Sequence, residues 1–317
     1  MTAGYGLVVA DECHHVPAAA FTDAVRKFPA RRRLGLTATP YRRDKLDDLI
    51  AWQVGETRHT ISPPRGADLG RPELALPGIM PPGGAARPVP VLHVHETSYR
   101  YSGDSSPQMP GGMAAIYRDL ANDDGRNRRI TADVSAALAR GRHCLVLTQW
   151  VAHLRKLAED LQQAGHDPVI LRGGMGARSR DAAIARLTPQ PGGPPLLVVA
   201  TGPYAGEGFD CPPLDTLFLA APIKWKGKLV QYAGRIMRPY PGKETAEVHD
   251  YHDAATGVLA ATLAGRAPGY ISLGFPDPRQ VTATESASSV PAAEPADTLA
   301  RGAVAPGDVT SDMTDRL

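Results

Sequence analysis

The sequence lacks several features that define common classes of protein. Its 317 residues include three cysteines, far apart and without the paired spacing of a disulfide framework or a zinc site: Cys13, Cys144 and Cys211. No run of about 18 apolar residues occurs, and no basic segment leads into an apolar one at the N-terminus. We therefore expect no membrane span and no signal peptide, and a reducing, cytoplasmic location.

Neither positive nor negative charge predominates in the sequence. The formal net charge is only +2, so any contact with nucleic acid has to come from local patches. Hydrophobic residues make up 43% and charged residues 21% of the chain, as is usual for soluble globular proteins. The length is sufficient for two domains.

Strand-like and helix-like segments alternate in two parts of the chain, residues 1–60 and residues 112–275. The first part is expected to contain strands at 5–10 and 33–36 and helices at 17–27 and 44–54. The second is expected to contain strands at 144–148, 168–171, 196–201, 216–220 and 247–251, and helices at 114–121, 125–139, 151–164, 177–187 and 228–237. Such alternation predicts an α/β fold with a parallel sheet, which binds ligands beyond the carboxyl ends of its strands.

Two segments interrupt this pattern. Residues 61–111 are rich in proline and glycine, at least up to residue 90, and are predicted to be a linker that contains one strand at 91–97. Residues 276–317 are rich in Ala, Pro, Ser, Thr and Asp with almost no aromatic residue, so they are predicted to be a disordered tail.

The first strand ends in Asp11-Glu12-Cys13-His14. In a DEXH box, a carboxylate in the place of Asp11 reaches Mg²⁺ and its neighbour, here Glu12, orients the attacking water. A polar turn between a strand and a helix explains the same four residues. The thiol and imidazoles here lack a second pair of ligands, so we do not expect zinc.

Thr37-Ala38-Thr39-Pro40 follows the second strand. Its pattern matches a motif that couples nucleotide state to strand binding, although the threonine hydroxyls could also cap backbone groups before the proline. Both interpretations can hold together.

The second part has polar or glycine residues after several strands. Thr148 ends one strand, Gly174 lies in a glycine turn, and Thr201 is followed by the segment GEGFD, which contains Gly208 and Asp210. Glycines allow the backbone to come close to a phosphate. A glycine pair before a helix can equally be plain turn geometry.

The segment QYAGRIMRP spans residues 231–239. On a helix, Gln231, Arg235 and Arg238 share one face, so the two arginines would point together across a cleft, one of them toward a γ-phosphate. The alternative is a solvated or salt-bridged helix face. Just before it, Lys226 belongs to KWKGK, a group of cations with one tryptophan that could grip a nucleic-acid strand or form an ordinary surface.

Taken in order, these blocks resemble the DEAD/DEAH-box (DEXH) helicases of superfamily 2 from about residue 5 to residue 253. The runs ILRGGMGARSRDAAIARL, LDTLFLAAPIKWKGKLVQYAGR and PGKETAEVHDYHD are most similar to helicases of TOTE conflict systems, with type III restriction helicases as broader relatives. The resemblance implies a partial first RecA-like lobe and one complete C-terminal RecA-like lobe. It also implies ATP-dependent unwinding or translocation, with ATP and Mg²⁺ as cofactors and nucleic acid, DNA rather than RNA, as partner.

The resemblance also assigns roles to single residues. The catalytic residues would be Asp11, Glu12, Arg235 and Arg238, with Asp11 as the magnesium ligand. Contacts to the nucleotide would come from Gln231, Gly208 and Asp210. Contacts to nucleic acid, or coupling to it, would come from His14, Thr37, Thr39, Thr148, Gly174, Thr201 and Lys226.

One departure from the family is important. Its members carry a Gly-x-x-x-x-Gly-Lys-Ser/Thr phosphate loop before the DEXH box. These 317 residues contain no such sequence, since Gly242-Lys243 lacks the earlier glycine. We therefore expect this chain alone to lack ATPase activity, with a separate N-terminal helicase half as a possible partner. The alternatives are a noncatalytic module that binds nucleic acid or a partner, and a decayed fragment.

Overall fold

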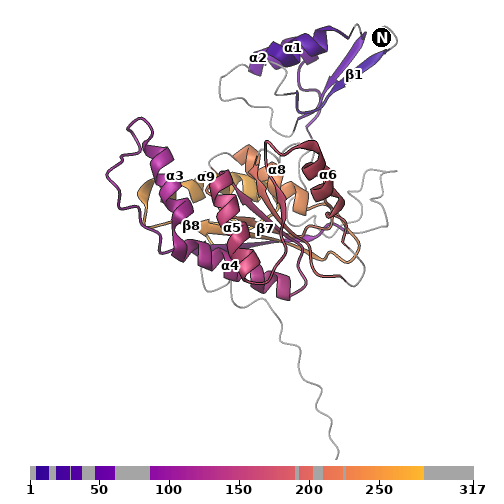
Figure 1. The fold of residues 1–317 in the computed structure, drawn as a ribbon. Coiled ribbons are helices and arrows are strands. Elements are labelled where there is room, and N and C mark those ends of the chain that lie inside the picture. The colour runs from indigo at the N-terminus through magenta and orange to yellow at the C-terminus, as the bar shows by residue number, and fades with distance from the viewer. Residues whose placement is uncertain are drawn as a thin grey trace, which may run out of the picture.

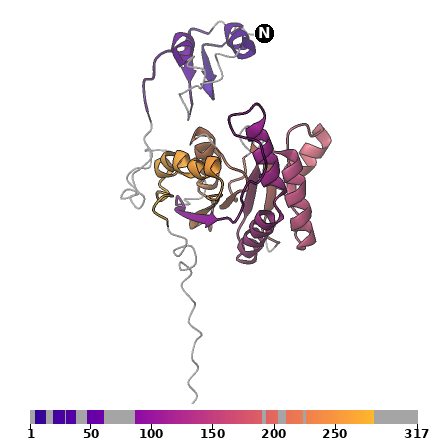
Figure 2. The ribbon, with the colours of Figure 1, turned by 90° about the vertical axis from the view of Figure 1, so that its left-hand side faces the viewer.

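The computed structural model places the described residues in two units, a smaller N-terminal one and a larger one (Figures 1 and 2). The residues that it describes are 5–13, 19–28, 30–37, 47–60, 86–189, 193–202, 210–223 and 226–281. The predicted tail beyond residue 281 and residues 61–85 of the predicted linker lie outside these ranges. None of the helices in the described part combines the length and apolar character needed to cross a bilayer.

The smaller unit contains two parallel strands and two helices. These are β1 (Leu7–Ala10), α1 (Ala19–Arg26), β2 (Arg32–Gly35) and α2 (Asp47–Val54). A Cβ added to Gly35 would lie 2.9 Å from both Cys13 Sγ and Val54 Cγ2. Glycine at this position therefore allows α2 and the turn after β1 to pack directly against β2.

The larger unit is built on a six-stranded, fully parallel sheet with the order β3-β8-β7-β4-β6-β5. Its strands are β3 (Val89–Glu96), β4 (Cys144–Thr148), β5 (Val169–Leu171), β6 (Leu197–Thr201), β7 (Thr216–Leu219) and β8 (Thr245–His252). Its helices are α3 (Gly112–Asn122), α4 (Asp124–Ala139), α5 (Val151–Gln163), α6 (Ala177–Ala185), α8 (Lys226–Ile236) and α9 (Gly257–Leu273). The α/β architecture with a parallel sheet is as predicted.

Helices cover both faces of the large sheet (Figure 2). In β4, Leu145 and Leu147 pack in the core cluster that contains residues of α8 and α9, whereas Cys144 and Val146 pack in the cluster that contains residues of α4 and α5. Successive side chains of a strand point to opposite faces, and a sheet buried on both faces has continuous apolar strands. The run CLVLT shows this pattern, and all five of its residues are buried.

The structure differs from the sequence-based expectation at two elements. Strand β3 lies within the predicted linker at residues 61–111, yet it pairs with β8 over eight positions, so the larger unit begins near Val89 rather than at residue 112. Proline at the second position of β3 is compatible with an edge strand, where one N–H needs no partner in the sheet. Helix α9 was not predicted, because Pro268 lies inside it and its apolar residues show little helical periodicity.

The three cysteines are free thiols, and all are buried. Their positions in the core agree with the expectation that none belongs to a disulfide framework. Burial raises the pKa of Cys211 to about 11, so its thiol stays protonated and unreactive at neutral pH.

Candidate functional site

The turn after β1 presents two carboxylates at the carboxyl edge of the small sheet. Asp11 is exposed and accepts a hydrogen bond from the Glu12 N–H at 2.9 Å. Among the described residues, Glu12 alone combines a side chain with a positive φ, at 49°. That conformation costs about 1–2 kcal/mol in a residue other than glycine, and strain of this kind is concentrated at functional sites.

Two backbone hydrogen bonds fix this turn to the neighbouring strand. The Cys13 N–H donates to the Leu36 carbonyl and the Leu36 N–H donates to the Ala10 carbonyl, each at 2.9 Å. Thr37, half-buried, follows directly and therefore lies at the same edge as Asp11 and Glu12. The positions of His14 and Thr39 lie outside the described residues.

Helix α8 brings its polar face to this turn. Gln231 Nε2 donates a hydrogen bond to Glu12 Oε1 at 3.5 Å, which links the two units. Burial and the neighbouring Arg238 lower the pKa of Arg235, while Asp210 and Glu12 act in the opposite direction. Arg235 is thus half-buried within the electrostatic reach of Glu12.

Arg238 has a different environment. It forms an ion pair with Asp210, and both side chains are largely exposed. Asp210 connects the segment after β6 with the end of α8. Gly208 lies outside the described residues, and so does the side chain of Lys226, the first residue of α8.

The two strand-end threonines of the large sheet are buried neighbours. Thr148 and Thr201 are register partners on β4 and β6. Thr148 Oγ1 lies 2.8 Å from His153 Nδ1, and His153 Nε2 lies 2.9 Å from Asn127 Oδ1. Burial, followed by Arg126 and Lys156, lowers the pKa of His153 to about 3, so the neutral ring accepts from Thr148 and donates to Asn127. A contact between the Thr148 hydroxyl and nucleic acid would require this internal bond to open.

The glycine turn after β5 is accessible from outside. Gly174 is exposed with a φ of +73°, a left-handed conformation that favours glycine. A Cβ added there would meet no atom within 4 Å. Backbone conformation alone therefore accounts for this glycine, and the open space beside it leaves the backbone free to approach a phosphate.

One close contact was missed by sequence reasoning. A Cβ added to Gly202, directly after β6, would lie 2.7 Å from Tyr232 Oη and 3.3 Å from Gln149 Nε2. Tyr232 is a buried residue of α8 that lies next to Gln231 in the sequence. The packing of α8 against the end of β6 thus depends on a glycine whose only sequence signal was its place after a strand.

Comparisons with known proteins find similar restriction-enzyme and helicase sequences. A family model described as "Type III restriction enzyme, res subunit" matches residues 2–42. "Putative helicase 22" of the Sulfolobus islandicus filamentous virus is 26% identical over 248 residues, which cover 77% of this chain and 42% of the viral protein. The chain therefore spans less than half the length of that relative.

Two solved structures share the fold at low identity. A fragment of a putative HsdR subunit of a type I restriction enzyme from Vibrio vulnificus superimposes with a TM-score of 0.56 at 17% identity, over 86% of this chain and 47% of that one. S. cerevisiae Dbp5 bound to RNA and ADP BeF3 superimposes with a TM-score of 0.51 at 12% identity, over 85% and 57% of the two chains. The large parallel sheet is thus of the RecA-like type.

Proposed function

We propose that this chain, which is similar to helicase and restriction-enzyme sequences, is a superfamily 2 helicase-like protein and forms part of an ATP-dependent motor that unwinds or moves along nucleic acid. One observation carries the proposal. Glu12 of the small unit and Gln231 of the large unit, which were assigned to the nucleotide site from separate motifs, meet in a hydrogen bond. This contact supports a hydrolysis site between the two units.

The residues present fit a site for ATP and Mg²⁺. Asp11 offers an exposed carboxylate, the hard oxygen ligand that Mg²⁺ prefers. Glu12 is held at an adjacent, strained backbone position, where its carboxylate can orient a water and accept its proton. Bound ATP and Mg²⁺ would supply the phosphoryl group and the charge that polarises it.

The environments of the two arginines give them different roles. Arg235 lies within the influence of Glu12 and is partly desolvated, so it is the residue that would neutralise charge developing on a phosphoryl group. Arg238 is engaged with Asp210 on the surface. We assign it a positioning role, holding the end of α8 against the segment after β6.

We infer that the phosphate loop is supplied from outside these 317 residues. The small sheet exposes about half of each of four apolar side chains: Leu7, Val9, Leu34 and Leu36. Parallel sheets are normally covered on both faces. An N-terminal helicase half that covers this sheet would bury these side chains and place its phosphate loop beside Asp11 and Glu12.

The test is reconstitution. The 317-residue chain is combined with the N-terminal half of a related helicase, in trans or fused before Tyr5, and ATP hydrolysis is measured with and without single-stranded DNA. We expect stimulated turnover that is lost in Glu12→Gln. A complex that binds DNA and ATP but never hydrolyses ATP would instead favour a noncatalytic binding module.

A further inference from the structure

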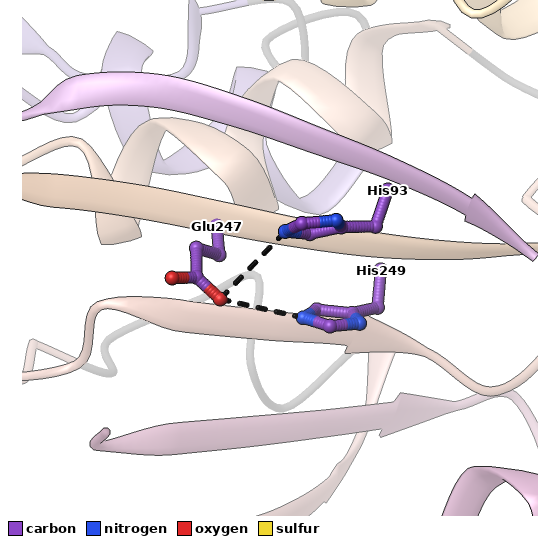
Figure 3. A group of neighbouring side chains, drawn as sticks. All are labelled: His93, Glu247 and His249. Carbon is purple, nitrogen blue, oxygen red and sulfur yellow. Dashed lines mark ion pairs between the residues drawn. The ribbon is translucent and has the colours of Figure 1, made fainter. Parts of the chain in front are cut away.

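Two strands far apart in the sequence place three metal-binding side chains on one face of the large sheet. His93 of β3 is the register partner of His249 of β8, and Glu247 lies two residues before His249. Side chains two residues apart on a strand share a face. Figure 3 shows the two imidazole rings and the carboxylate directed toward one another.

The distances between the ligand atoms are close to those of a metal site. Glu247 Oε2 lies 3.8 Å from His93 Nε2 and 3.6 Å from His249 Nε2, and one atom of each residue lies within 4.8 Å of the other two. Metal bonds of about 2.1 Å in a tetrahedral site place ligand atoms about 3.4 Å apart. Side-chain movements of about 1 Å would therefore close the site.

His249 provides an independent indication that a ligand belongs here. Its side chain is 7% exposed, and its Nε2 atom is buried without a hydrogen-bond partner, since Glu247 lies beyond hydrogen-bond distance. Buried polar atoms normally have a partner. Phe218 stacks on the ring with its centroid at 4.3 Å, which keeps Nε2 directed at the space shared with Glu247.

The other nitrogen of His249 is held by a second histidine. His249 Nδ1 lies 2.9 Å from His95 Nε2, and Arg129 Nη2, which can only donate, lies 3.2 Å from His95 Nδ1. His95 therefore donates from Nε2 to His249 Nδ1 in this structure. A metal on His249 Nε2 would reverse this hydrogen bond: the exposed Arg129 would move into solvent, and the proton of His95 would face Asp133 Oδ2, 3.7 Å from Nδ1.

Two cations pair with the Glu247 carboxylate: Arg142 faces Oε1 at 3.6 Å, and Arg140 competes for Oε2, the oxygen that faces the two imidazoles. Arg140 Nη2 donates to Glu247 Oε2 at 3.0 Å. Its side chain is 44% exposed, so it can move into solvent when Glu247 takes another partner. Removal of Arg140 should accordingly strengthen binding of a metal ion.

We propose that His93, Glu247 and His249 form a site for Zn²⁺ that cross-links the edge strand β3 to β8. Two imidazoles and one carboxylate are a known set of three zinc ligands, with the fourth position left to water. Solvent can reach this position, because the side chains of His93 and Glu247 are 14% and 15% exposed. The proposal is independent of the motor function, which uses other residues.

The experiment uses the full chain, freed of metal with a chelator and titrated with ZnCl₂ in a calorimeter. We expect one equivalent to bind and to raise the melting temperature. His93→Ala and Glu247→Gln should each weaken binding by more than about 100-fold, since even loss of an outer-shell partner costs 10–100-fold. Arg140→Ala should bind more tightly than wild type.

His166→Gln is the matched control, because this half-buried histidine bonds Ser135 in the same unit, away from the site. The absorption spectrum of the Co²⁺-loaded chain reports the ligand set separately from stability, and it should change in His93→Ala but not in His166→Gln. Wild-type affinity in His93→Ala, or no saturable binding by the wild-type chain, would overturn the proposal.

Discussion

At the scale of single residues, Lys243 has a structural role that its place in the sequence does not indicate. In the sequence it is the second half of a Gly-Lys pair that lacks the rest of a phosphate loop. In the structure its ammonium group donates to the carbonyls of Pro212, Leu214 and Arg238, at 3.0, 2.6 and 3.0 Å. Burial lowers its pKa to about 8. The lysine thus joins the end of α8 to the segments before β7 and β8.

We predict that Lys243→Met lowers the free energy of unfolding by about 3 kcal/mol, because the substitution leaves buried carbonyls without a donor. Urea denaturation measures this change. Lys156→Met is the control, since Lys156 forms only partly exposed ion pairs with Asp124 and Asp160, worth about 0–1 kcal/mol. Equal losses in both variants would show that Lys243 is not a structural clamp.

The two arginines of α8 give a second prediction at this scale. In the reconstituted motor, Arg235→Ala should reduce turnover by about 10³-fold with little change in ATP binding, because an arginine finger acts on charge in the transition state. Arg238→Ala should have a smaller effect, and Arg238→Asp combined with Asp210→Arg should recover part of it. Arg128→Ala, on the exposed face of α4, is the control. Wild-type turnover in Arg235→Ala would remove this residue from the active site.

At the scale of elements, buried charge fixes α9 to the sheet. Arg266 Nη2 and Nε each lie 2.8 Å from a carboxylate oxygen of Asp250 on β8, and Tyr270 Oη donates to the same carboxylate at 2.7 Å. The Arg266 side chain is 1% exposed. This bidentate pair determines how the helix that sequence reasoning missed lies on β8.

We predict that Arg266→Met destabilises the chain by about 3–5 kcal/mol, because it leaves the buried Asp250 carboxylate without its cation. Arg279→Met should change stability by less than about 1 kcal/mol, since the Arg279 side chain is 58% exposed beside Asp277. Thermal denaturation followed by circular dichroism compares the two. Similar melting temperatures for Arg266→Met and wild type would contradict this account.

The elements also show what the sequence could and could not predict. Strands buried on both faces are continuous apolar runs, so β4 was predicted with its observed bounds and β6 and β7 within one residue. The polar residues at strand ends followed from the same pattern. Strand β3 was harder to place, because its partner β8 lies about 150 residues later and only that pairing assigns it to the sheet.

At the scale of the whole molecule, the candidate site lies between two units, and sequence reasoning could name its residues but not their contacts. Gln231 and Glu12 are 219 positions apart, and no local pattern relates them. Sequence reasoning could not distinguish the environments of Arg235 and Arg238 either, because both residues fit the same helical spacing on α8. The motif order predicted a cleft between lobes, and only coordinates could say which side chains meet there.

We predict that the purified 317-residue chain shows no ATP hydrolysis stimulated by nucleic acid, because it contains no phosphate-loop sequence to hold the phosphates. A coupled phosphate-release assay with single-stranded DNA and RNA tests this. Turnover that disappears in Asp11→Asn would refute it and would show that other residues can hold the nucleotide.

Limited proteolysis tests the division of the chain. We expect the first cuts within residues 61–85, where proline and glycine are dense, and a resistant core that begins near Val89 and ends near residue 281. Mass spectrometry of the fragments gives these bounds. An early cut between residues 97 and 112 would contradict the assignment of β3 to the larger unit.

The place of β3 has a mechanical consequence. The chain enters the larger unit at the first residue of this strand, which runs parallel to β8 in a ladder of eight register pairs. A pull along the axis of β3 loads the evenly spaced bonds of a parallel ladder together, in shear, whereas a pull across it would open them one after another. The connection between the units is therefore anchored where tension along the strand meets its greatest resistance.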